Sequence, residues 1–165
     1  EYQQNIVDTA SHRCGLFMDC GLGKSAVSLC LSKKHNYNGK TLVITTKSLK
    51  RNWLNEISLW WPEGSDRICV LSKEEFKKHH KTLDYYDAVI FDEAHYAAYS
   101  TNQIHKAMWL YISHHNPRFI WLATATPTLA NVMSVWGLSR LVGKPLGNYF
   151  SFKMKYFFLE IIAKS

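Results

Sequence analysis

The stretch of residues 16–25 constrains the fold of this chain more than any other. An apolar segment passes into a turn with two glycines and then into Lys24 and Ser25, and residues 26–34 have the composition of a helix. Glycines let backbone N–H groups turn toward an anion, and a helix N-terminus adds the positive end of its dipole. A lysine and a serine at this spacing supply a point charge for phosphate and a hydroxyl for Mg²⁺. The stretch therefore predicts a strand, a phosphate-binding loop and a helix, in that order.

The candidate nucleotide-binding residues of this loop are Asp19, Cys20, Gly21, Leu22, Gly23, Lys24 and Ser25. One position departs from the common pattern G-x-x-x-x-G-K-[ST], because Met18 stands where that pattern has its first glycine. The alternative interpretation of the stretch alone is a glycine-containing turn between a strand and a helix, with an exposed lysine.

A second polar motif follows a strand-like segment in the middle of the chain. The apolar run of residues 88–91 ends in Asp92-Glu93-Ala94-His95. In an α/β sheet, ligands bind at the carboxyl ends of the strands, so two adjacent carboxylates there favour a site. We expect Asp92 to hold Mg²⁺ and Glu93 to orient or deprotonate the water that attacks a γ-phosphate. The alternative, an exposed acidic turn, does not explain why the acids follow a wholly apolar strand.

Hydrophobic periodicity and turn residues predict an alternation of strands and helices. We expect buried strands over residues 16–18, 41–45, 67–71, 88–91 and 119–123. We expect helices over residues 3–13, 26–34, 73–80, 101–114, 131–141 and 150–158, and one that carries Trp53, Ile57 and Trp60 inward and stops at Pro62. Thr101 is the expected cap of its helix. This alternation predicts an α/β domain in which a mostly parallel sheet lies between two helical layers.

Three further groups of residues are candidates for contacts with ligands. Gln3 has an amide that can pair with the edge of adenine, although a surface glutamine is the commoner explanation. The second group lies at the start of a helix, where backbone N–H groups can hold nucleic-acid phosphates, and comprises Lys47, Ser48 and Arg51. Its alternative is a solvated basic turn. The third group, Thr124 and Thr126, can connect a nucleotide pocket to a nucleic-acid groove beside His95; its alternative is a turn that ends at Pro127.

Composition sets the class of protein. A length of 165 residues suits one domain, and a net charge of +7 favours a polyanionic partner. The 4 cysteines form no C-x-x-C pair, so we expect free thiols rather than a zinc site. No apolar run approaches the roughly 18 residues of a membrane span, and the N-terminus lacks the pattern of a signal peptide, so we expect no membrane association and a cytoplasmic or nuclear location.

As a set, these motifs resemble the N-terminal RecA-like motor lobe of superfamily 2 helicases and translocases. The resemblance is to the Swi/Snf-related branch and its phage-type relatives, in which the glycine replaced by Met18 is often absent. It rests on Tyr2-Gln3, residues 19–25, residues 42–53 with their S-L-x-x-N-W pattern, residues 92–95, and residues 124–127 with Asn131 downstream. Thr46 and Ala125 depart from the branch, which usually has proline and glycine there, so the nucleic-acid contacts are less closely matched than the nucleotide site.

The resemblance implies that residues 1–165 are a helicase ATP-binding lobe, a P-loop NTPase domain that uses ATP and Mg²⁺ and couples hydrolysis to movement on duplex DNA. The implied catalytic residues are Lys24, Asp92, Glu93 and His95, with Ser25 and Asp92 as the Mg²⁺ ligands and Gln3 at the adenine. The family's second RecA-like lobe, which supplies an arginine finger, is absent from these residues. We therefore expect weak hydrolysis by the lobe alone, since such an arginine contributes about 10³-fold or more to the rate.

Several other functions share part of this motif set. An RNA helicase lobe of the DEAD/DEAH type shares Asp-Glu-Ala-His and a T-A-T motif, although the S-L-x-x-N-W pattern disfavours it. The motor part of a restriction or repair enzyme would share every motif. A nucleic-acid-binding module that does not hydrolyse nucleotide is a further alternative, disfavoured by the intact Lys24, Asp92 and Glu93.

Overall fold

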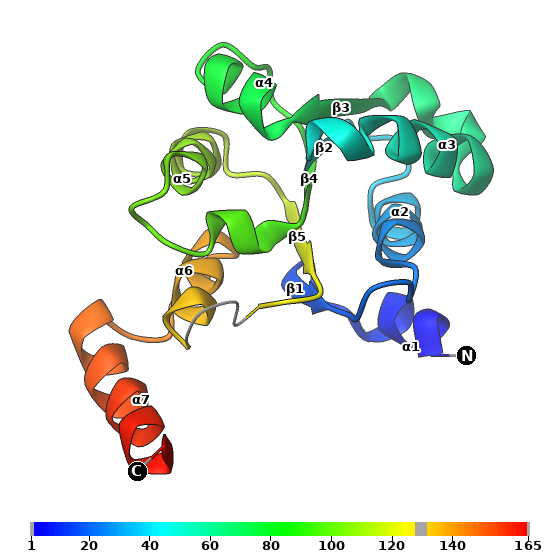
Figure 1. Ribbon diagram of the computed structural model, residues 1–165. Coiled ribbons are helices and arrows are strands. Elements are labelled where there is room, and N and C mark those ends of the chain that lie inside the picture. The colour runs from blue at the N-terminus through cyan, green and yellow to red at the C-terminus, as the bar shows by residue number, and fades with distance from the viewer. Residues whose placement is uncertain (1, 128–131, 165) are drawn as a thin grey trace.

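A five-stranded parallel sheet forms the centre of the molecule (Figure 1). The computed structural model describes residues 2–127 and 132–164, with side chains as far as residue 156. The strands are β1 (Arg13–Phe17), β2 (Thr41–Thr45), β3 (Ile68–Ser72), β4 (Ala88–Asp92) and β5 (Phe119–Thr124). Their order is β1-β5-β4-β2-β3, and every neighbouring pair is parallel. The predicted α/β class is confirmed.

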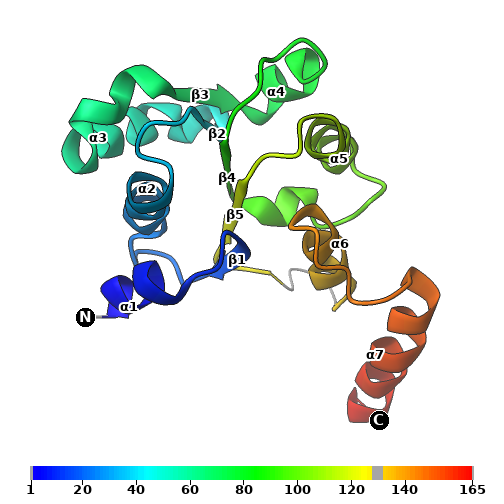
Figure 2. The same ribbon diagram turned by 180° about the vertical axis from the view of Figure 1, so that it is seen from behind.

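Helices cover both faces of the sheet, which gives three layers (Figures 1 and 2). One layer holds α1 (Tyr2–Thr9), α2 (Lys24–His35) and α3 (Lys50–Trp60), and the other holds α4 (Lys73–His79), α5 (Gln103–His115) and α6 (Met133–Leu141). Short 3₁₀ turns occupy Lys47–Leu49, Pro62–Arg67 and Ala94–Ala97. Helix α7 (Tyr149–Lys164) extends away from the sheet in both views, and its Phe152 packs against Met133 and Trp136 of α6.

Alternation along the central strands builds the two cores. Val89 and Phe91 of β4 belong to the core beneath α4, α5 and α6, whereas Ala88 and Ile90 belong to the core beneath α1, α2 and α3. Successive side chains of a strand point to opposite faces, so a strand covered by helices on both sides is apolar throughout. This explains the apolar run that precedes Asp92. Asp92 itself is the last residue of β4, so its carboxylate lies at the carboxyl end of a central strand.

The N-terminal boundary differs from the prediction. Helix α1 ends at Thr9 instead of extending to Arg13, and β1 begins at Arg13 instead of Leu16. Residues 13–17 pair in register with residues 120–124 of β5, and the Arg13 side chain donates to the Asn116 side chain at 2.6 Å. The ladder with β5 therefore determines the conformation of a segment whose helical periodicity was local and weak.

Two side-chain predictions in the helices are wrong. Trp60 is 45% exposed and donates to Glu56 on its own helix, while Trp61, just beyond the end of α3, is fully buried. Thr101 does not cap α5, because that helix begins at Gln103 with Asn102 in the cap position and no side-chain cap bond. The predicted inward face of α5 is confirmed, since it buries Ile104, Ala107, Met108, Tyr111 and Ile112. The other bounds shift by one or two residues, except that α7 continues to Lys164.

Candidate active site

The sheet register brings the phosphate loop and the two carboxylates to one edge. Phe17, the last residue of β1, pairs with Thr124 of β5, and Asp92, the last residue of β4, pairs with Ala123. Neighbouring strands lie about 4.8 Å apart, so the ends of β1 and β4 are about 10 Å apart with β5 between them. This span suits a phosphate group and a hydrated ion.

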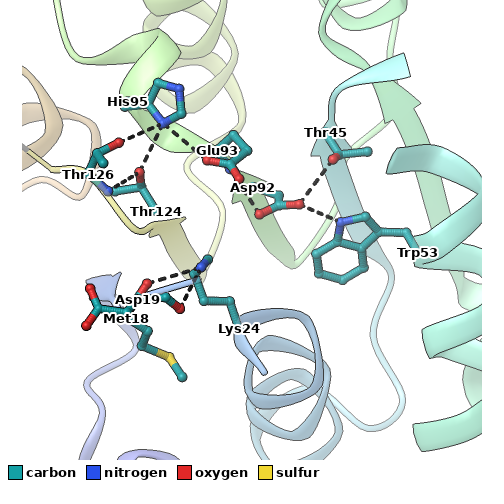
Figure 3. A network of polar contacts seen from close by, with 10 residues as sticks. All are labelled: Met18, Asp19, Lys24, Thr45, Trp53, Asp92, Glu93, His95, Thr124 and Thr126. Atoms are coloured by element: carbon teal, nitrogen blue, oxygen red, sulfur yellow. Dashed lines mark hydrogen bonds and ion pairs between the residues drawn. The ribbon is translucent and has the colours of Figure 1, made fainter. Parts of the chain in front are cut away.

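The loop that follows β1 contains two glycines in the left-handed backbone conformation. Gly21 has φ 80° and Gly23 has φ 78°, values that glycine adopts without steric cost. Lys24 begins α2, and its ammonium donates to the carbonyl oxygens of Met18 and Asp19, both at 3.1 Å (Figure 3). The sequence-predicted strand, loop and helix are therefore present in the predicted order.

The position of the Met18 side chain explains why the loop accepts a residue other than glycine there. Its side chain is 5% exposed and packs in the core beneath α1, α2 and α3, while its carbonyl oxygen accepts from Lys24. Its backbone N–H donates to the carbonyl oxygen of Thr124 at 3.2 Å. An apolar side chain is thus accommodated at this position because the loop leaves the sheet with its side chain still buried.

Gln3 lies against the loop, although it is distant in sequence. Its amide nitrogen donates to the Leu22 carbonyl oxygen at 2.9 Å, and a Cβ added at Gly23 would overlap the same nitrogen. Asp19, Cys20 and Leu22 are exposed, and Ser25 is partly buried in the first turn of α2. The structure thus gathers the predicted nucleotide-binding residues at one loop, and the role of Gln3 toward adenine stays a prediction.

Asp92 is buried and held from two other elements. Its side chain is 5% exposed. Its Oδ2 accepts from the indole N–H of Trp53 at 2.8 Å and from the Thr45 hydroxyl at 3.2 Å (Figure 3). Its Oδ1 accepts from the backbone N–H of Glu93 at 3.0 Å. Sequence reasoning missed both side-chain donors, although Trp53 lies within the S-L-x-x-N-W pattern and was assigned only to the core.

Glu93 and His95 connect the acidic motif to the end of β5. Glu93 is a non-glycine residue in the left-handed region, with φ 52° and ψ 48°, and its Oε2 lies 3.2 Å from His95 Nδ1. The same nitrogen lies 3.1 Å from the Thr124 hydroxyl and 3.5 Å from the Thr126 hydroxyl (Figure 3). The predicted proximity of His95 to Thr124 and Thr126 is therefore present. Asn131 lies outside the described residues.

The donor set at this edge suits a phosphate and a hard cation. Lys24, the α2 N-terminus and two left-handed glycines favour an anion, while the Ser25 hydroxyl and the Asp92 carboxylate are oxygen ligands. Mg²⁺ usually keeps several waters and needs only one or two protein ligands. Among the described residues, at this edge or away from it, no group of three or more histidine, cysteine, aspartate or glutamate side chains could hold a metal ion by itself.

The candidate nucleic-acid residues lie in the 3₁₀ turn that precedes α3 and in the first turn of α3. Lys47, Ser48 and Arg51 are exposed, and within the described residues neither Lys47 nor Arg51 has an ion-pair partner. Ser48 is 3.1 Å from the Thr46 hydroxyl, a contact that proline at position 46 would remove. The neighbouring Lys50 is instead paired with Glu75 of α4 at 2.7 Å. Two unpaired cations therefore face solvent beside a serine.

The fold is similar to the RecA-like α/β fold of solved ATPase and helicase cores. A SWI2/SNF2 ATPase core from Sulfolobus solfataricus, solved with double-stranded DNA, matches with a TM-score of 0.74 and 21% identity over 93% of this chain and 36% of its own. The Hef helicase domain of Pyrococcus furiosus matches with a TM-score of 0.69 and 15% identity over 87% of this chain and 36% of its own.

Sequence comparisons find similarity to two kinds of protein. Residues 62–129 match the family model for the type III restriction enzyme res subunit. An ISWI chromatin-remodeling complex ATPase of Arabidopsis thaliana, CHR17, is 28% identical over 73% of this chain. The chain spans 14% of the length of that relative. Among the described residues, no helix has the length and apolar composition to cross a membrane.

Proposed function

We propose that this chain is the Mg-ATP-binding lobe of a DNA-dependent ATPase of the Swi/Snf-related type. The observation that carries the proposal is the convergence of Lys24, Asp92 and Glu93 at one edge of the parallel sheet, beyond or at the ends of β1 and β4, which are separated only by β5. Motifs that are far apart in sequence thus meet where an α/β sheet binds ligand.

The roles follow from the groups that each residue presents. Lys24 and the loop N–H groups bind the β- and γ-phosphates. The side-chain amide of Gln3 pairs with the edge of adenine. Ser25 and Asp92 hold Mg²⁺, which neutralises charge on the phosphates when bound. Glu93 orients the attacking water and takes up its proton, and its contact with His95 links that step to Thr124 and Thr126.

Duplex DNA is the proposed partner, with a second RecA-like lobe completing the cleft in the parent protein. The exposed, unpaired Lys47 and Arg51 support a phosphate contact, and the similar SWI2/SNF2 core was solved with double-stranded DNA. Two of the similar proteins are of SWI2/SNF2 and ISWI type, which favours this branch over an RNA helicase of the DEAD/DEAH type. The phage-type relationship and the intracellular location stay predictions.

A restriction-enzyme motor is the second candidate function. It is favoured by the match of residues 62–129 to the type III restriction enzyme model, a segment that contains both the acidic motif and residues 124–127. The two candidates share the nucleotide chemistry and the DNA partner, so they differ in what the remaining parts of the parent protein do.

Binding of a fluorescent ATP analogue tests the proposal. Wild type is expected to bind it with Mg²⁺. Lys24→Ala is expected to bind about 10- to 100-fold more weakly, since charge-assisted hydrogen bonds contribute about 1.5–3 kcal/mol. Glu93→Gln is expected to retain binding and lose hydrolysis. Lys33→Ala is the matched control, because Lys33 lies on the same helix and pairs with Glu63.

Two results would overturn the proposal: no nucleotide binding by wild type, or wild-type affinity in Lys24→Ala. The DNA partner is tested by competition between duplex DNA and RNA at two salt concentrations. A steep loss of affinity with salt is expected for phosphate contacts, and Lys47→Ala with Arg51→Ala should flatten it. A flat response in wild type would contradict the assigned surface.

A further inference from the structure

The Asp92 carboxylate is oriented by groups that the nucleotide motifs do not include. One oxygen, Oδ2, accepts two side-chain hydrogen bonds, from Trp53 at 2.8 Å and from Thr45 at 3.2 Å. The other, Oδ1, accepts only the N–H of the next residue. All three side chains are buried, with exposed fractions of 1% for Trp53, 0% for Thr45 and 5% for Asp92.

The pairing of Trp53 with Asp92 satisfies two buried polar groups at once. A buried carboxylate requires donors, and a buried indole N–H requires an acceptor, so each satisfies the other. Burial alone does not produce such a bond in this chain, because the buried indole nitrogen of Trp61 has no hydrogen-bond partner among the described residues. Trp60, on the same helix as Trp53, bonds to Glu56 at the surface, away from the sheet edge.

We propose that Trp53, assisted by Thr45, is a positioning residue for the magnesium-binding carboxylate. By occupying Oδ2, the two donors fix the plane of the carboxylate and would leave Oδ1 available to Mg²⁺ when the ion is bound. Groups that hydrogen-bond a metal ligand typically change metal affinity by about 10- to 100-fold when they are removed. The inference rests on the proposed function, since it concerns the same Mg-nucleotide site.

The position of Trp53 also joins two surfaces of the lobe. Lys47 and Ser48 lie in the 3₁₀ turn directly before α3, and Arg51 lies with Trp53 at the beginning of α3. The exposed basic residues and the donor to Asp92 therefore belong to one continuous segment. A polyanion bound at these basic residues would contact the same helix that orients the carboxylate. Helix α3 is therefore a direct physical connection between the candidate nucleic-acid surface and the metal-binding side of the site.

The test compares nucleotide affinity with Mg²⁺ and with EDTA, using the fluorescent ATP analogue. The ratio of the two affinities isolates the metal contribution. Trp53→Phe keeps an aromatic ring and removes the N–H, and it is expected to reduce this ratio about 10-fold while leaving the EDTA affinity unchanged. Trp60→Phe is the matched control, because it removes an indole N–H bonded to a carboxylate on the same helix, and it should leave the ratio unchanged.

An NMR titration, which starts from the ligand-free protein and adds Mg²⁺ and nucleotide, gives a second readout. With ¹⁵N-labelled tryptophan, the indole N–H resonance that disappears in Trp53→Phe belongs to Trp53, and it should respond to addition of Mg²⁺ and nucleotide. The Trp60 resonance, assigned with Trp60→Phe, should not respond. Thr45→Val removes the second donor and should lower the Mg²⁺ ratio in the same direction by a smaller factor.

The outcomes separate this inference from the proposed function. If wild type binds no nucleotide, the proposed function fails. If wild type binds Mg-nucleotide and Trp53→Phe keeps its Mg²⁺ ratio, the positioning role is wrong. A purely structural role would lower both affinities together. Should Trp53→Phe fail to fold, a wild-type ratio in Thr45→Val would overturn the proposal, and a reduced ratio there would support it.

Discussion

The phosphate loop and the acidic end of β4 meet at one edge of the sheet, but they are held in different ways. The Lys24 ammonium donates to carbonyl oxygens of Met18 and Asp19, six and five residues away in the chain. Asp92 is held by Trp53 and Thr45, which are 39 and 47 residues away. The Lys24 side chain is therefore held by the backbone of its own loop, whereas the orientation of the Asp92 carboxylate depends on the packed sheet and on α3.

Because of this difference, substitutions in the two regions should affect nucleotide binding and the free energy of unfolding to different extents. A loop side chain that contacts only its own backbone can be removed without disturbing the core. A donor to Asp92 lies within that core, so its removal disturbs both the carboxylate and the packing around it. Substitutions in the two regions should therefore leave different signatures in unfolding and binding experiments.

Truncation of Trp53 tests the comparison with the largest expected effect. Trp53→Ala removes a side chain that is 1% exposed and also leaves Asp92 without its closest donor. We expect the free energy of unfolding to fall by about 3–5 kcal/mol, the usual cost of removing a buried aromatic side chain. Urea or guanidinium denaturation followed by circular dichroism measures this change.

Lys24→Ala is the matching change in the loop and should lower the free energy of unfolding by about 1 kcal/mol or less, because Lys24 is partly exposed and its two hydrogen bonds reach only carbonyl oxygens of its own loop. Equal losses in Trp53→Ala and Lys24→Ala would show that the two regions are not held differently. The comparison would then need a structural role for the Lys24 contacts with Met18 and Asp19.

The same difference explains which parts of the site could be predicted from the sequence. The loop, Asp92 and Glu93 were predictable because each motif is a contiguous pattern next to an apolar strand, and the strand alternation gave the three-layer α/β fold. The donors to Asp92 were not predictable, since a tryptophan at helical spacing reads as a core residue until the fold shows which polar group lies beside it. The burial of Trp61 in place of Trp60 was not predictable for a related reason, because Trp61 lies just beyond the end of α3, where helical spacing no longer indicates which side chain is buried.

Local backbone geometry tests the loop side of the comparison. Gly21 and Gly23 both have positive φ, so an alanine at either position should lower the free energy of unfolding by about 1–2 kcal/mol. Only the Cβ at Gly23 meets another side chain, the amide of Gln3, and nothing lies within 4 Å of a Cβ at Gly21. Gly23→Ala should therefore also displace Gln3 from the Leu22 carbonyl oxygen.

A double-mutant cycle with Gln3→Ala measures that displacement. Coupling with Gly23→Ala and additivity with Gly21→Ala are expected, because residues in contact couple and separated ones add. Additivity in both cycles would mean that Gln3 is not held against the loop in solution, and the placement of Gln3 beside the nucleotide site would lose its support.

The last prediction concerns the ion pair between Lys50 of α3 and Glu75 of α4, and it has the smallest expected effect. It tests how firmly α3, the helix that carries the donor to Asp92, is held. The Lys50 ammonium, followed by the Ser72 backbone N–H, lowers the pKa of Glu75 from 4.5 to about 2. Because the pKa is lower in the folded state, this stabilisation is fully present above pH 4.5 and is lost as the pH falls through about 2. Since the pair is partly exposed, Glu75→Gln should cost about 1 kcal/mol or less at pH 7.

Glu74→Gln is the matched control, because Glu74 is exposed, lies on the same helix turn and makes no hydrogen bond or ion pair among the described residues. Denaturation at a series of pH values should show the gap between wild type and Glu75→Gln narrowing below pH 4.5, with no such trend for Glu74→Gln. Loss of the pair also frees Lys50 beside Lys47 and Arg51, so Glu75→Gln should strengthen duplex DNA binding at low salt. A constant gap across pH, or DNA affinity equal to that of Glu74→Gln, would mean that Glu75 neither anchors α3 nor neutralises Lys50 at this surface.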